Sequence, residues 1–443
     1  MKTIHKILPA IFENHTTLPQ QLRQSITLWV GNVLKITLGL GTSILLLRGL
    51  GPEQTGRMAL VLNVISLFAI IGEFGLRDAA LNYLARFRHR DPNQAATLAR
   101  AFFFAKLFLS LSATTLALLG ASWIANYFYQ TSSITHLLYF AAFTLLTNGL
   151  LGYSMVLLEA QQRFALISKL NSIQAIIRLA LIATLFLSKK LTLPIYFMLE
   201  ASLPFFVFLY TLWKPPFPFL KSTGPLEPAW KLLFDFTKWH AISTLFATVL
   251  ARLDILILSY FHPSFAVGLY AATQTVITRF NFVKGPILTT AFAEACRRTT
   301  ISELRAFIRE SLIMTGGITL LFLPALFWGD YLISLLFGTS YAQDKSTFIA
   351  LLISFLISLN IEPISYVLFP LNKARLIALR NFVQLLITSL IGLWLIPTYG
   401  GIGAALTVLT KTLVFTFLNA GLIYWYLSQS PDKEIVIQTN YPQ

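Results

Sequence analysis

Charged residues stand inside several long apolar segments of the chain, where an ionised side chain is costly to place, and seven of them are candidates for a functional site. They are Lys35, Arg178, Glu200, Arg252, Asp254, Glu362 and Lys411. A charge at the centre of an apolar span costs at least about 2.5–3.5 kcal/mol on insertion scales, so it usually faces a polar cavity or an opposite charge. Four of the seven are cations and three are carboxylates. A site with excess positive charge favours an anionic ligand, above all phosphate or pyrophosphate, through charge-assisted hydrogen bonds.

These groups have two alternative uses. In the first, the cations line an aqueous cavity and bind the anionic ligand, while the carboxylates pair with them or take up H⁺ or Na⁺. In the second, all of the charges form interhelical salt bridges that hold the protein together. Lys106 lies closer to the inner end of its span, can extend its ammonium group to the membrane surface, and is expected to be structural.

Helical spacing places polar residues beside some of these charges. Asn171, Gln174 and Arg178 stand at i, i+3 and i+7, so they share one face of a helix. The two amides are therefore candidate substrate-binding residues. Arg252 and Asp254 are two positions apart and point to nearly opposite sides of their helix. Asp254 need not neutralise Arg252, and one of the two should contact another helix.

The segments that carry these residues are typical of a membrane protein. The 443-residue chain is 56% hydrophobic and only 12% charged, with a mean hydropathy of +0.69. A membrane-spanning helix needs about 20 mostly apolar residues. Twelve such segments are predicted, at 28–47, 58–76, 101–125, 137–158, 167–187, 193–212, 239–261, 267–291, 312–337, 348–369, 377–396 and 402–427.

The second six segments resemble the first six at an offset of about 210 residues. Trp29 recurs as Trp239. The run Gly51-Pro-Glu-Gln-Thr-Gly56 is echoed by His262-Pro-Ser-Phe-Ala-Val-Gly268, with one residue inserted. Such a repeat predicts two six-helix bundles that face each other, with the site between them, as in an alternating-access transporter.

The expected domains follow from this repeat. We predict an N-terminal bundle at 1–213, a cytoplasmic linker at 214–236 and a C-terminal bundle at 237–443. Five prolines between Lys214 and Asp235 favour an extended path for the linker. No loop is long enough to fold as a separate domain, which argues against most enzyme classes that need an extramembrane catalytic module.

The basic residues are distributed unevenly between the two sides of the membrane. With the N-terminus inside, about 24 of the 34 Lys and Arg residues fall on the inner side, including Lys284 at the inner end of its span. Only about five lie opposite, namely Arg48, Arg57, Lys189, Lys190 and Lys345. This positive-inside bias places both termini in the cytoplasm. The net charge of +16 therefore indicates contact with anionic lipid headgroups rather than with nucleic acid.

Motifs for other functions are absent from the sequence. The first residues, Met1 to Gln24, do not form a secretory signal, so the first span is expected to remain in the mature protein. The single Cys296 and six scattered histidines have no metal-ligand spacing. No nucleotide-binding loop, zinc-protease motif or dinucleotide fingerprint occurs. We therefore expect no metal, no cofactor and no enzymatic activity.

Several motifs together resemble a known family. Arg48-Gly-Leu-Gly-Pro-Glu-Gln-Thr-Gly-Arg-Met-Ala-Leu60, followed by Glu73-Phe-Gly-Leu-Arg77, resembles the start of Wzx-type polysaccharide flippases. Arg252-Leu-Asp-Ile-Leu-Ile-Leu-Ser259 and Val267-Gly-Leu-Tyr-Ala-Ala-Thr273 resemble the family's stretch in and just after the seventh span. The resemblance covers essentially the whole chain. Such flippases export O-antigen or exopolysaccharide units and belong to the multidrug/oligosaccharidyl-lipid/polysaccharide exporter superfamily.

The resemblance implies an all-α, MATE-like membrane fold with two pseudo-symmetric six-helix bundles. It implies flipping of undecaprenyl-pyrophosphate-linked oligosaccharide from the cytoplasmic to the periplasmic leaflet of the bacterial inner membrane, for polysaccharides such as the O-antigen of lipopolysaccharide. The implied partners are membrane lipids, glycosyltransferases and a polysaccharide polymerase. In this interpretation the four buried cations and the two amides bind the head group of the substrate.

The chain departs from the family pattern at one position, and the sequence also has to be weighed against other functions of membrane proteins. Relatives often carry a basic residue after the aspartate of the seventh span, where this chain has Ile255. A cation-coupled multidrug exporter of the same fold would favour a net-acidic cavity, which the basic excess argues against. A membrane glycan polymerase or ligase would need a long outer loop that the sequence lacks. Peptidoglycan lipid flippases usually have two extra spans, which are missing here.

Overall fold

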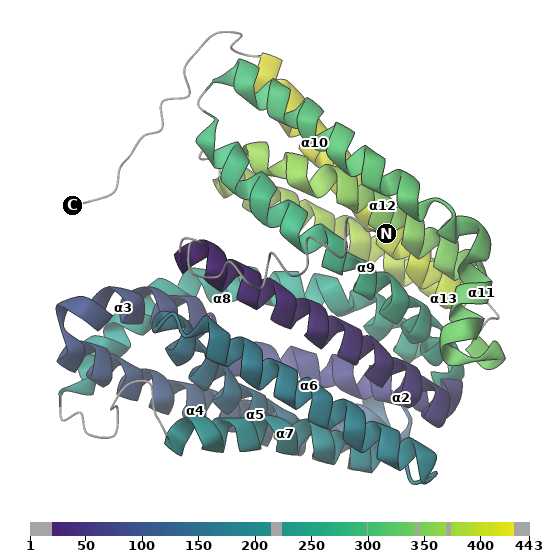
Figure 1. Ribbon diagram of the computed structural model, residues 1–443. Coiled ribbons are helices and arrows are strands. Elements are labelled where there is room, and N and C mark those ends of the chain that lie inside the picture. Colours follow the sequence, from purple (N-terminus) through teal and green to yellow (C-terminus); the bar gives the residue numbers. More distant parts are fainter. Residues whose placement is uncertain (1–19, 214–223, 299, 342–344, 369–373, 429–443) are drawn as a thin grey trace, which may run out of the picture. The chain divides into compact units, whose positions relative to one another are not determined.

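Long helices make up almost all of the computed structural model (Figure 1). It describes residues 20–213, 224–298, 300–341, 345–368 and 374–428, and these form no strand. Among the described residues, seven helical segments are long and apolar enough to cross a membrane. The expected all-α membrane fold is therefore confirmed, and the chain is a multi-pass membrane protein. The expected count of twelve spans is not established.

The helices follow the predicted apolar segments closely. The first half of the chain contains α2 (Gln20–Glu73), α3 (Leu76–Arg90), α4 (Pro92–Trp123), α5 (Thr135–Ala160), α6 (Phe164–Leu187) and α7 (Leu193–Trp213). The second half contains α8 (Leu226–Phe261), α9 (Ser264–Arg297), α10 (Ile301–Phe322), α11 (Ala325–Phe337), α12 (Lys345–Ser365) and α13 (Ala374–Ser428). The predicted span 312–337 is divided at Pro324, which stands between α10 and α11.

Two of these helices each contain two predicted spans joined at a glycine. Gly51 interrupts α2 with φ 75°, and Gly400 interrupts α13 with φ 59°. A positive φ is readily adopted only by glycine, so each glycine allows a sharp bend. Pro52 then begins the second part of α2, a position where its missing N–H group costs no hydrogen bond. The bend between the two spans of each helix therefore depends on residues at the bend itself.

The chain folds into two compact units that do not follow its sequence halves. Unit 1 comprises residues 1–43, 71–119 and 139–241, and unit 2 comprises residues 44–70, 120–138 and 242–443. The second part of α2 therefore packs with the second half of the chain. The predicted division into two sequence-contiguous bundles stays a prediction. Of the predicted linker, residues 214–223 lie outside the described residues, and α8 already begins at Leu226, earlier than expected.

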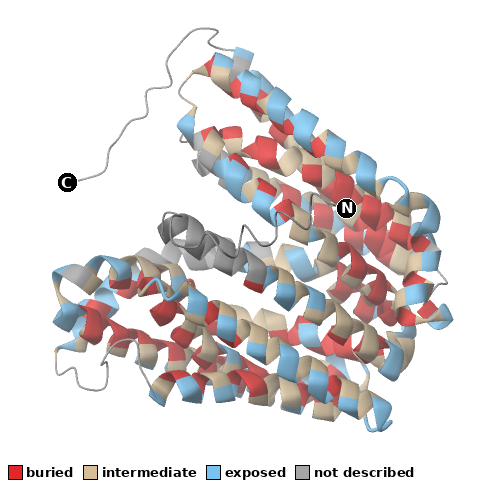
Figure 2. Ribbon diagram, in the orientation of Figure 1, coloured by how far each residue is buried: buried red, intermediate tan, exposed pale blue. Residues whose placement is uncertain are grey.

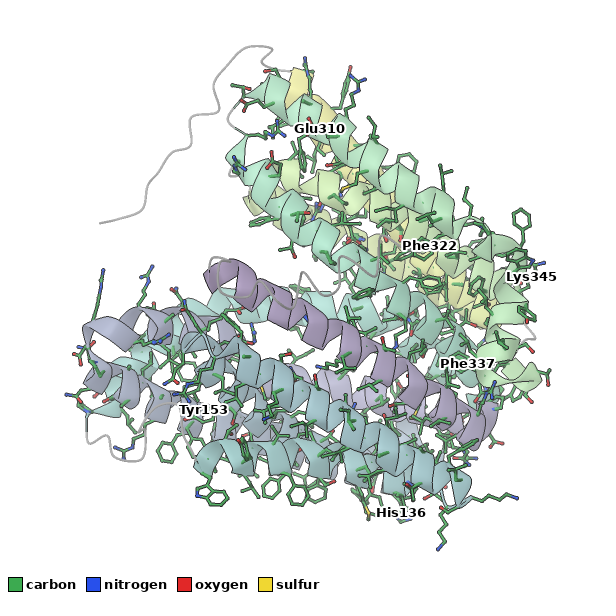
Figure 3. All side chains as sticks on the ribbon, viewed as in Figure 1. His136, Tyr153, Glu310, Phe322, Phe337 and Lys345 are labelled. Atoms are coloured by element: carbon green, nitrogen blue, oxygen red, sulfur yellow. The ribbon has the colours of Figure 1, made fainter. Side chains whose placement is uncertain are left out.

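Each unit has its own apolar core. In unit 1, the ring of Tyr153 on α5, which Figure 3 labels, has its centroid 5.4 Å from that of Phe102 and 5.2 Å from that of Phe103 on α4. In unit 2, Phe322 and Phe355 pack with their ring centroids 5.5 Å apart. Buried and exposed positions alternate along the helices (Figure 2), and many exposed positions carry large apolar side chains. Such exposed apolar faces suit contact with lipid.

Candidate functional site

Unit 1 contains an ion pair between two residues that the sequence singles out. The Nη2 atom of Arg178 on α6 lies 2.9 Å from Oε2 of Glu200 on α7. Tyr196, one helical turn before Glu200, also hydrogen-bonds to this carboxylate. The Nε atom of Arg178 is buried and has no hydrogen-bond partner among the described residues. Glu200 therefore neutralises Arg178, while the Nε–H group of the guanidinium has no acceptor in the described part of the chain.

Lys35 on α2 lies in the same electrostatic environment. It is close enough to Arg178 for the two positive charges to repel each other. It is exposed and forms no ion pair within the described part of the chain. Asn171 and Gln174 on α6 are partly exposed. Unit 1 thus brings two of the candidate cations together, and the helix that carries Arg178 also carries the two candidate amides.

Asp254 on α8 is buried against α9 and faces two neutral donors. Its Oδ2 atom accepts hydrogen bonds from the Tyr270 hydroxyl group and from Nε2 of Gln274, the latter at 2.9 Å. Its Oδ1 atom has no partner in the described part of the structure, although Asp254 is only 6% exposed. The contact with α9 confirms that one of Arg252 and Asp254 faces another helix. No cation among the described residues forms an ion pair with this carboxylate.

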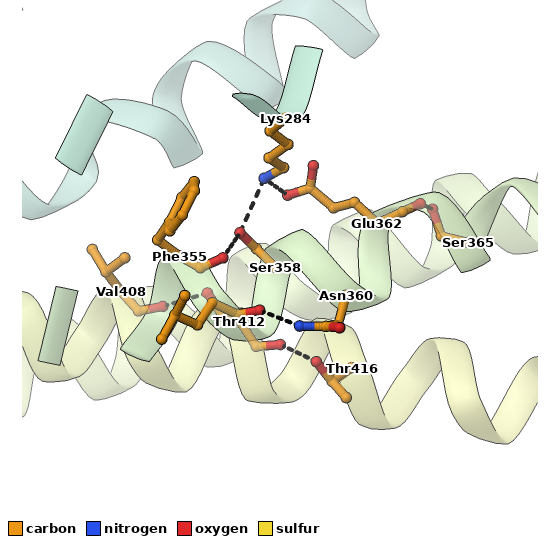
Figure 4. Close-up of polar contacts among 10 residues, drawn as sticks. Lys284, Phe355, Ser358, Asn360, Glu362, Ser365, Val408, Thr412 and Thr416 are labelled. Atoms are coloured by element: carbon orange, nitrogen blue, oxygen red, sulfur yellow. Dashed lines mark hydrogen bonds and ion pairs between the residues drawn. The ribbon is translucent and has the colours of Figure 1, made fainter. Parts of the chain in front are cut away.

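Glu362 on α12 pairs with a lysine of α9 (Figure 4). The Nζ atom of Lys284 lies 2.5 Å from Oε1 of Glu362 and donates a second hydrogen bond, of 3.0 Å, to the Ser358 hydroxyl group. The side chain of Lys284 is 10% exposed and that of Glu362 is 33% exposed. Ser358 and Glu362 stand one turn apart on α12, so both reach the same ammonium group. Glu362 is therefore half of an interhelical ion pair.

Arg252 and Lys411 are candidate cations of unit 2 that form no ion pair among the described residues. Arg252 is exposed on α8, and Lys411 is partly exposed on α13. The backbone carbonyl group of Lys411 accepts a hydrogen bond of 3.1 Å from Nε2 of Gln384. Within the described ranges no carboxylate neutralises either side chain, so both are candidates for binding an anion.

A second polar stripe lies on α13, at an offset of about 210 residues from the stripe of amides on α6. The two stripes differ in their contacts. Asn381 and Gln384 occupy the repeat positions of Asn171 and Gln174, but their partners lie within α13 itself. Nη1 of Arg380 lies 2.6 Å from Oδ1 of Asn419, and Nη2 lies 3.0 Å from Oδ1 of Asn381. This stripe therefore joins the two parts of α13, whereas the amides on α6 have no such contact among the described residues.

Lys106 on α4 does not reach the membrane surface as expected. Its side chain is 3% exposed, and Nζ lies 2.7 Å from Oε1 of Glu73 and 2.9 Å from the carbonyl oxygen of Gly72. These two residues close α2, where Phe74 and Gly75 turn the chain with φ 37° and 68°. The helix end supplies both a carboxylate and a free carbonyl group, so burial with these partners replaces hydration of the ammonium group.

Among the residues in these contacts that the sequence did not single out are Lys284, Tyr270 and Gln274. Lys284 counted there only as a basic residue at the inner end of a span. The sequence did contain an indication of its role, because Lys284 lies within the predicted apolar segment 267–291, where a charge needs a partner. Tyr270 and Gln274 also had a signal, since their spacing of four places them on one face of α9. The sequence did not indicate that this face meets Asp254.

Comparison with known proteins agrees with this fold. The family model described as polysaccharide biosynthesis protein matches residues 22–292, more than half of the chain. No match was found among curated protein sequences.

Solved structures of membrane transporters share the architecture. The lipid II flippase MurJ in an inward closed conformation is 14% identical, with a TM-score of 0.68, covering 90% of this chain and 87% of that one. An inward-facing multidrug resistance MATE family transporter of the MOP superfamily is 12% identical, with a TM-score of 0.59, covering 89% and 94%. The eukaryotic MATE transporter AtDTX14 is 12% identical, with a TM-score of 0.57, covering 92% and 96%. At these identities the likeness establishes the fold alone.

Proposed function

Since the chain belongs to the polysaccharide biosynthesis protein family, we propose that it flips undecaprenyl-pyrophosphate-linked oligosaccharide from the cytoplasmic to the periplasmic leaflet by alternating access. The lipid tail would stay in the bilayer while the charged head group crosses through the protein. The fold shared with a lipid flippase and with multidrug transporters supports this proposal. In this role the protein is a transporter and not an enzyme.

The balance of charges within the helices carries the proposal. Glu200 and Glu362 are occupied by basic partners, so they do not neutralise the remaining cations. Lys35, Arg252 and Lys411 form no ion pair among the described residues. Free cations in membrane helices favour a diphosphate, which offers several acceptor oxygens and a high negative charge. We assign these three side chains, with Arg178, Asn171 and Gln174, to binding of the head group.

Asp254 is the proposed coupling residue. The two glutamates that the sequence also offered for coupling face cations, whereas Asp254 faces the neutral Tyr270 and Gln274 of α9. On its own helix, Arg252 lies on nearly the opposite side and is exposed. We propose that Asp254 binds H⁺ or Na⁺, since a buried carboxylate without a cationic partner favours a cation beside it. Exchange of this ion across the membrane could drive the flipping cycle.

The location and partners follow from the proposed substrate. We propose that both termini lie in the cytoplasm, which the excess of Lys and Arg on one side supports, and that the protein resides in the inner membrane, where its proposed substrate is found. Glycosyltransferases would assemble the substrate on the cytoplasmic leaflet, and a polysaccharide polymerase would use it on the periplasmic leaflet. Cysteine labelling of each terminus from either side of the membrane would test this topology.

Leaflet exchange in proteoliposomes tests the function directly. The probe is fluorescently labelled undecaprenyl-pyrophosphate-linked oligosaccharide, and a membrane-impermeant glycosidase reports the fraction in the outer leaflet. We expect Arg252→Ala and Lys411→Ala each to slow exchange by about tenfold, because each removes a charge-assisted contact with the diphosphate. Arg297→Ala is the matched control, because Arg297 is 80% exposed at the end of α9.

Each outcome of this experiment has a distinct meaning. Exchange that is slowed in the two variants but not in the control supports binding of the head group by these cations. Exchange that is equal in all four proteins leaves the flippase proposal standing but removes these residues from the substrate site. If the wild type does not exchange any lipid-linked glycan but expels a cationic dye, it is a multidrug exporter. Glycan transfer without exchange would instead indicate a polymerase or ligase.

A further inference from the structure

The second part of α2 packs against α9 through two glycines, both within unit 2. A Cβ atom built on Gly56 would lie 1.7 Å from the carbonyl oxygen of Ser264. A Cβ atom built on Gly268 would lie 1.8 Å from the carbonyl oxygen of Pro52. Both distances are far shorter than van der Waals contact, so only glycine allows the two backbones to come this close.

The two contacts are reciprocal under the internal repeat. Gly56 and Gly268 are the final glycines of the two repeated motifs, and Pro52 and Ser264 each stand four residues before the glycine. The first motif therefore presents a carbonyl group to the glycine of the second, and the second does the same for the first. This symmetric arrangement makes a flat backbone contact between segments from the two sequence halves.

Tyr341 adds polar contacts to the same side of α2. Its hydroxyl group donates a hydrogen bond of 2.8 Å to the carbonyl oxygen of Leu47 and shares another of 2.8 Å with the Thr55 hydroxyl group. Burial raises the pKa of Tyr341 to about 12, so the hydroxyl group stays protonated and able to donate at neutral pH. Thr55 is only 1% exposed in this arrangement.

Arg48 connects the bend of α2 to the end of α11. Its Nε atom lies 2.9 Å from the carbonyl oxygen of Leu336, and its Nη2 atom lies 2.5 Å from that of Leu335. These carbonyl groups belong to the last turn of α11, where they lack intrahelical partners and carry a partial negative charge. The guanidinium group therefore caps α11 while holding α2 beside it.

These contacts are well suited to opening and closing. The two glycine contacts at the centre join backbone to backbone. The hydrogen bonds of Tyr341 and Arg48 around them go to neutral groups, and water can take the place of these bonds. The predicted topology places Arg48 and Arg57 on the outer side of the membrane. We propose that the reciprocal glycine contact, with Tyr341 and Arg48, is the outer gate, closed here and separated when the head group leaves. This inference rests on the proposed transport function.

Labelling of a buried cysteine tests the gate without any substrate. Thr55→Cys is made in a Cys296→Ser background, and its reaction with a water-soluble maleimide is followed in lipid nanodiscs, where the reagent reaches both faces. Gly268→Ala should accelerate labelling about tenfold, because the added methyl group cannot fit against Pro52 and favours the open state. Arg48→Gln should accelerate it about threefold by removing the contact with α11.

Gly316→Ala is the matched control, because a Cβ atom on Gly316 of α10 meets no atom within 4 Å. It should leave the labelling rate of Thr55→Cys unchanged. Size-exclusion chromatography checks that each variant is folded, and Arg48→Gln provides the test if Gly268→Ala is not. Equal labelling rates in Arg48→Gln, any folded Gly268→Ala and Gly316→Ala would overturn the gate. Because no glycan is present, that result is independent of whether the protein flips the proposed substrate.

Discussion

Glu362 and Asp254 are carboxylates on membrane helices of unit 2, but their surroundings differ by one positive charge. Glu362 lies 2.5 Å from the ammonium group of Lys284, whereas Asp254 accepts hydrogen bonds from Tyr270 and Gln274. Glu362 is also the more exposed of the two, since its side chain is 33% exposed and Asp254 is 6% exposed. The better hydrated carboxylate thus has a cation, and the more deeply buried one has none among the described residues.

This difference shows that position in an apolar segment does not define the role of a charge. An ion pair is neutral as a unit, so Glu362 and Lys284 can remain charged together throughout a transport cycle. Asp254 lacks such compensation, and the free energy of its charged form depends on what binds to it. We therefore separate a structural pair on α9 and α12 from a proposed ion-binding carboxylate on α8.

The pair formed by Lys106 and Glu73 extends the comparison to unit 1. Lys106 is more deeply buried than Lys284, with side chains 3% and 10% exposed, but Glu73 is 47% exposed and the Gly72 carbonyl group is a second partner. At an offset of about 210 residues, Gly152 takes the place of Glu362, and it lies beside the Lys106–Glu73 pair. Each half of the chain thus has a buried lysine–glutamate pair near equivalent positions, built from different helices.

Removing the lysine of the unit 2 pair should have the largest effect on stability. Lys284→Met leaves Glu362 without its cation, and we expect a loss of about 3–4 kcal/mol in the free energy of unfolding. Denaturant unfolding in detergent micelles, followed by tryptophan fluorescence, measures it. The double variant Lys284→Met/Glu362→Leu should recover most of the loss, because no unpaired charge remains. Equal losses in the single and double variants would show that the pairing is not what stabilises these helices.

The same substitution in unit 1 should cost less. Lys106→Met leaves the Gly72 carbonyl group unsatisfied, but the exposed part of Glu73 can be hydrated in its place. We expect the free energy of unfolding to fall by about 1–3 kcal/mol, measured in the same micelles. A loss greater than that of Lys284→Met would contradict the proposed dependence on exposure of the glutamate.

Asp254→Asn should have little effect on folding but a large effect on coupling. Asparagine keeps the shape of the side chain and one acceptor oxygen, so the expected change in unfolding free energy is below about 1 kcal/mol. Leaflet exchange in proteoliposomes should no longer respond to an imposed H⁺ or Na⁺ gradient, because asparagine does not bind either ion at this position. An unchanged response to both gradients would remove Asp254 from the coupling mechanism.

A surface ion pair gives the smallest effect. Arg297 lies 3.5 Å from Glu294 on the last turn of α9, and its side chain is 80% exposed. Arg297→Ala should change the unfolding free energy by less than about 0.5 kcal/mol, since water screens an exposed pair. A change comparable to that of Lys284→Met would mean that burial does not distinguish these pairs.

The sequence by itself determined the general nature of the protein. Long apolar segments leave few alternatives to membrane helices, because every backbone polar group in lipid must be satisfied within the same segment. The glycines that end the first span of each pair of joined helices are also local signals, since the positive φ values of Gly51 and Gly400 depend on the absence of a side chain. The family resemblance in the motifs at 48–77 and 252–273 is confirmed by the match to residues 22–292.

Only the tertiary structure decided which charges meet. Lys284 and Glu362 are 78 residues apart, and no periodicity within α9 or α12 indicates that they face each other. Lys106 likewise reaches the end of α2, where hydropathy alone predicted a side chain directed to the membrane surface. Hydropathy and spacing describe one helix at a time, whereas pairing depends on how each helix is rotated about its axis and which helix lies beside it. The rotation and neighbours of each helix explain why Glu362 faces Lys284, whereas Asp254 faces no cation among the described residues.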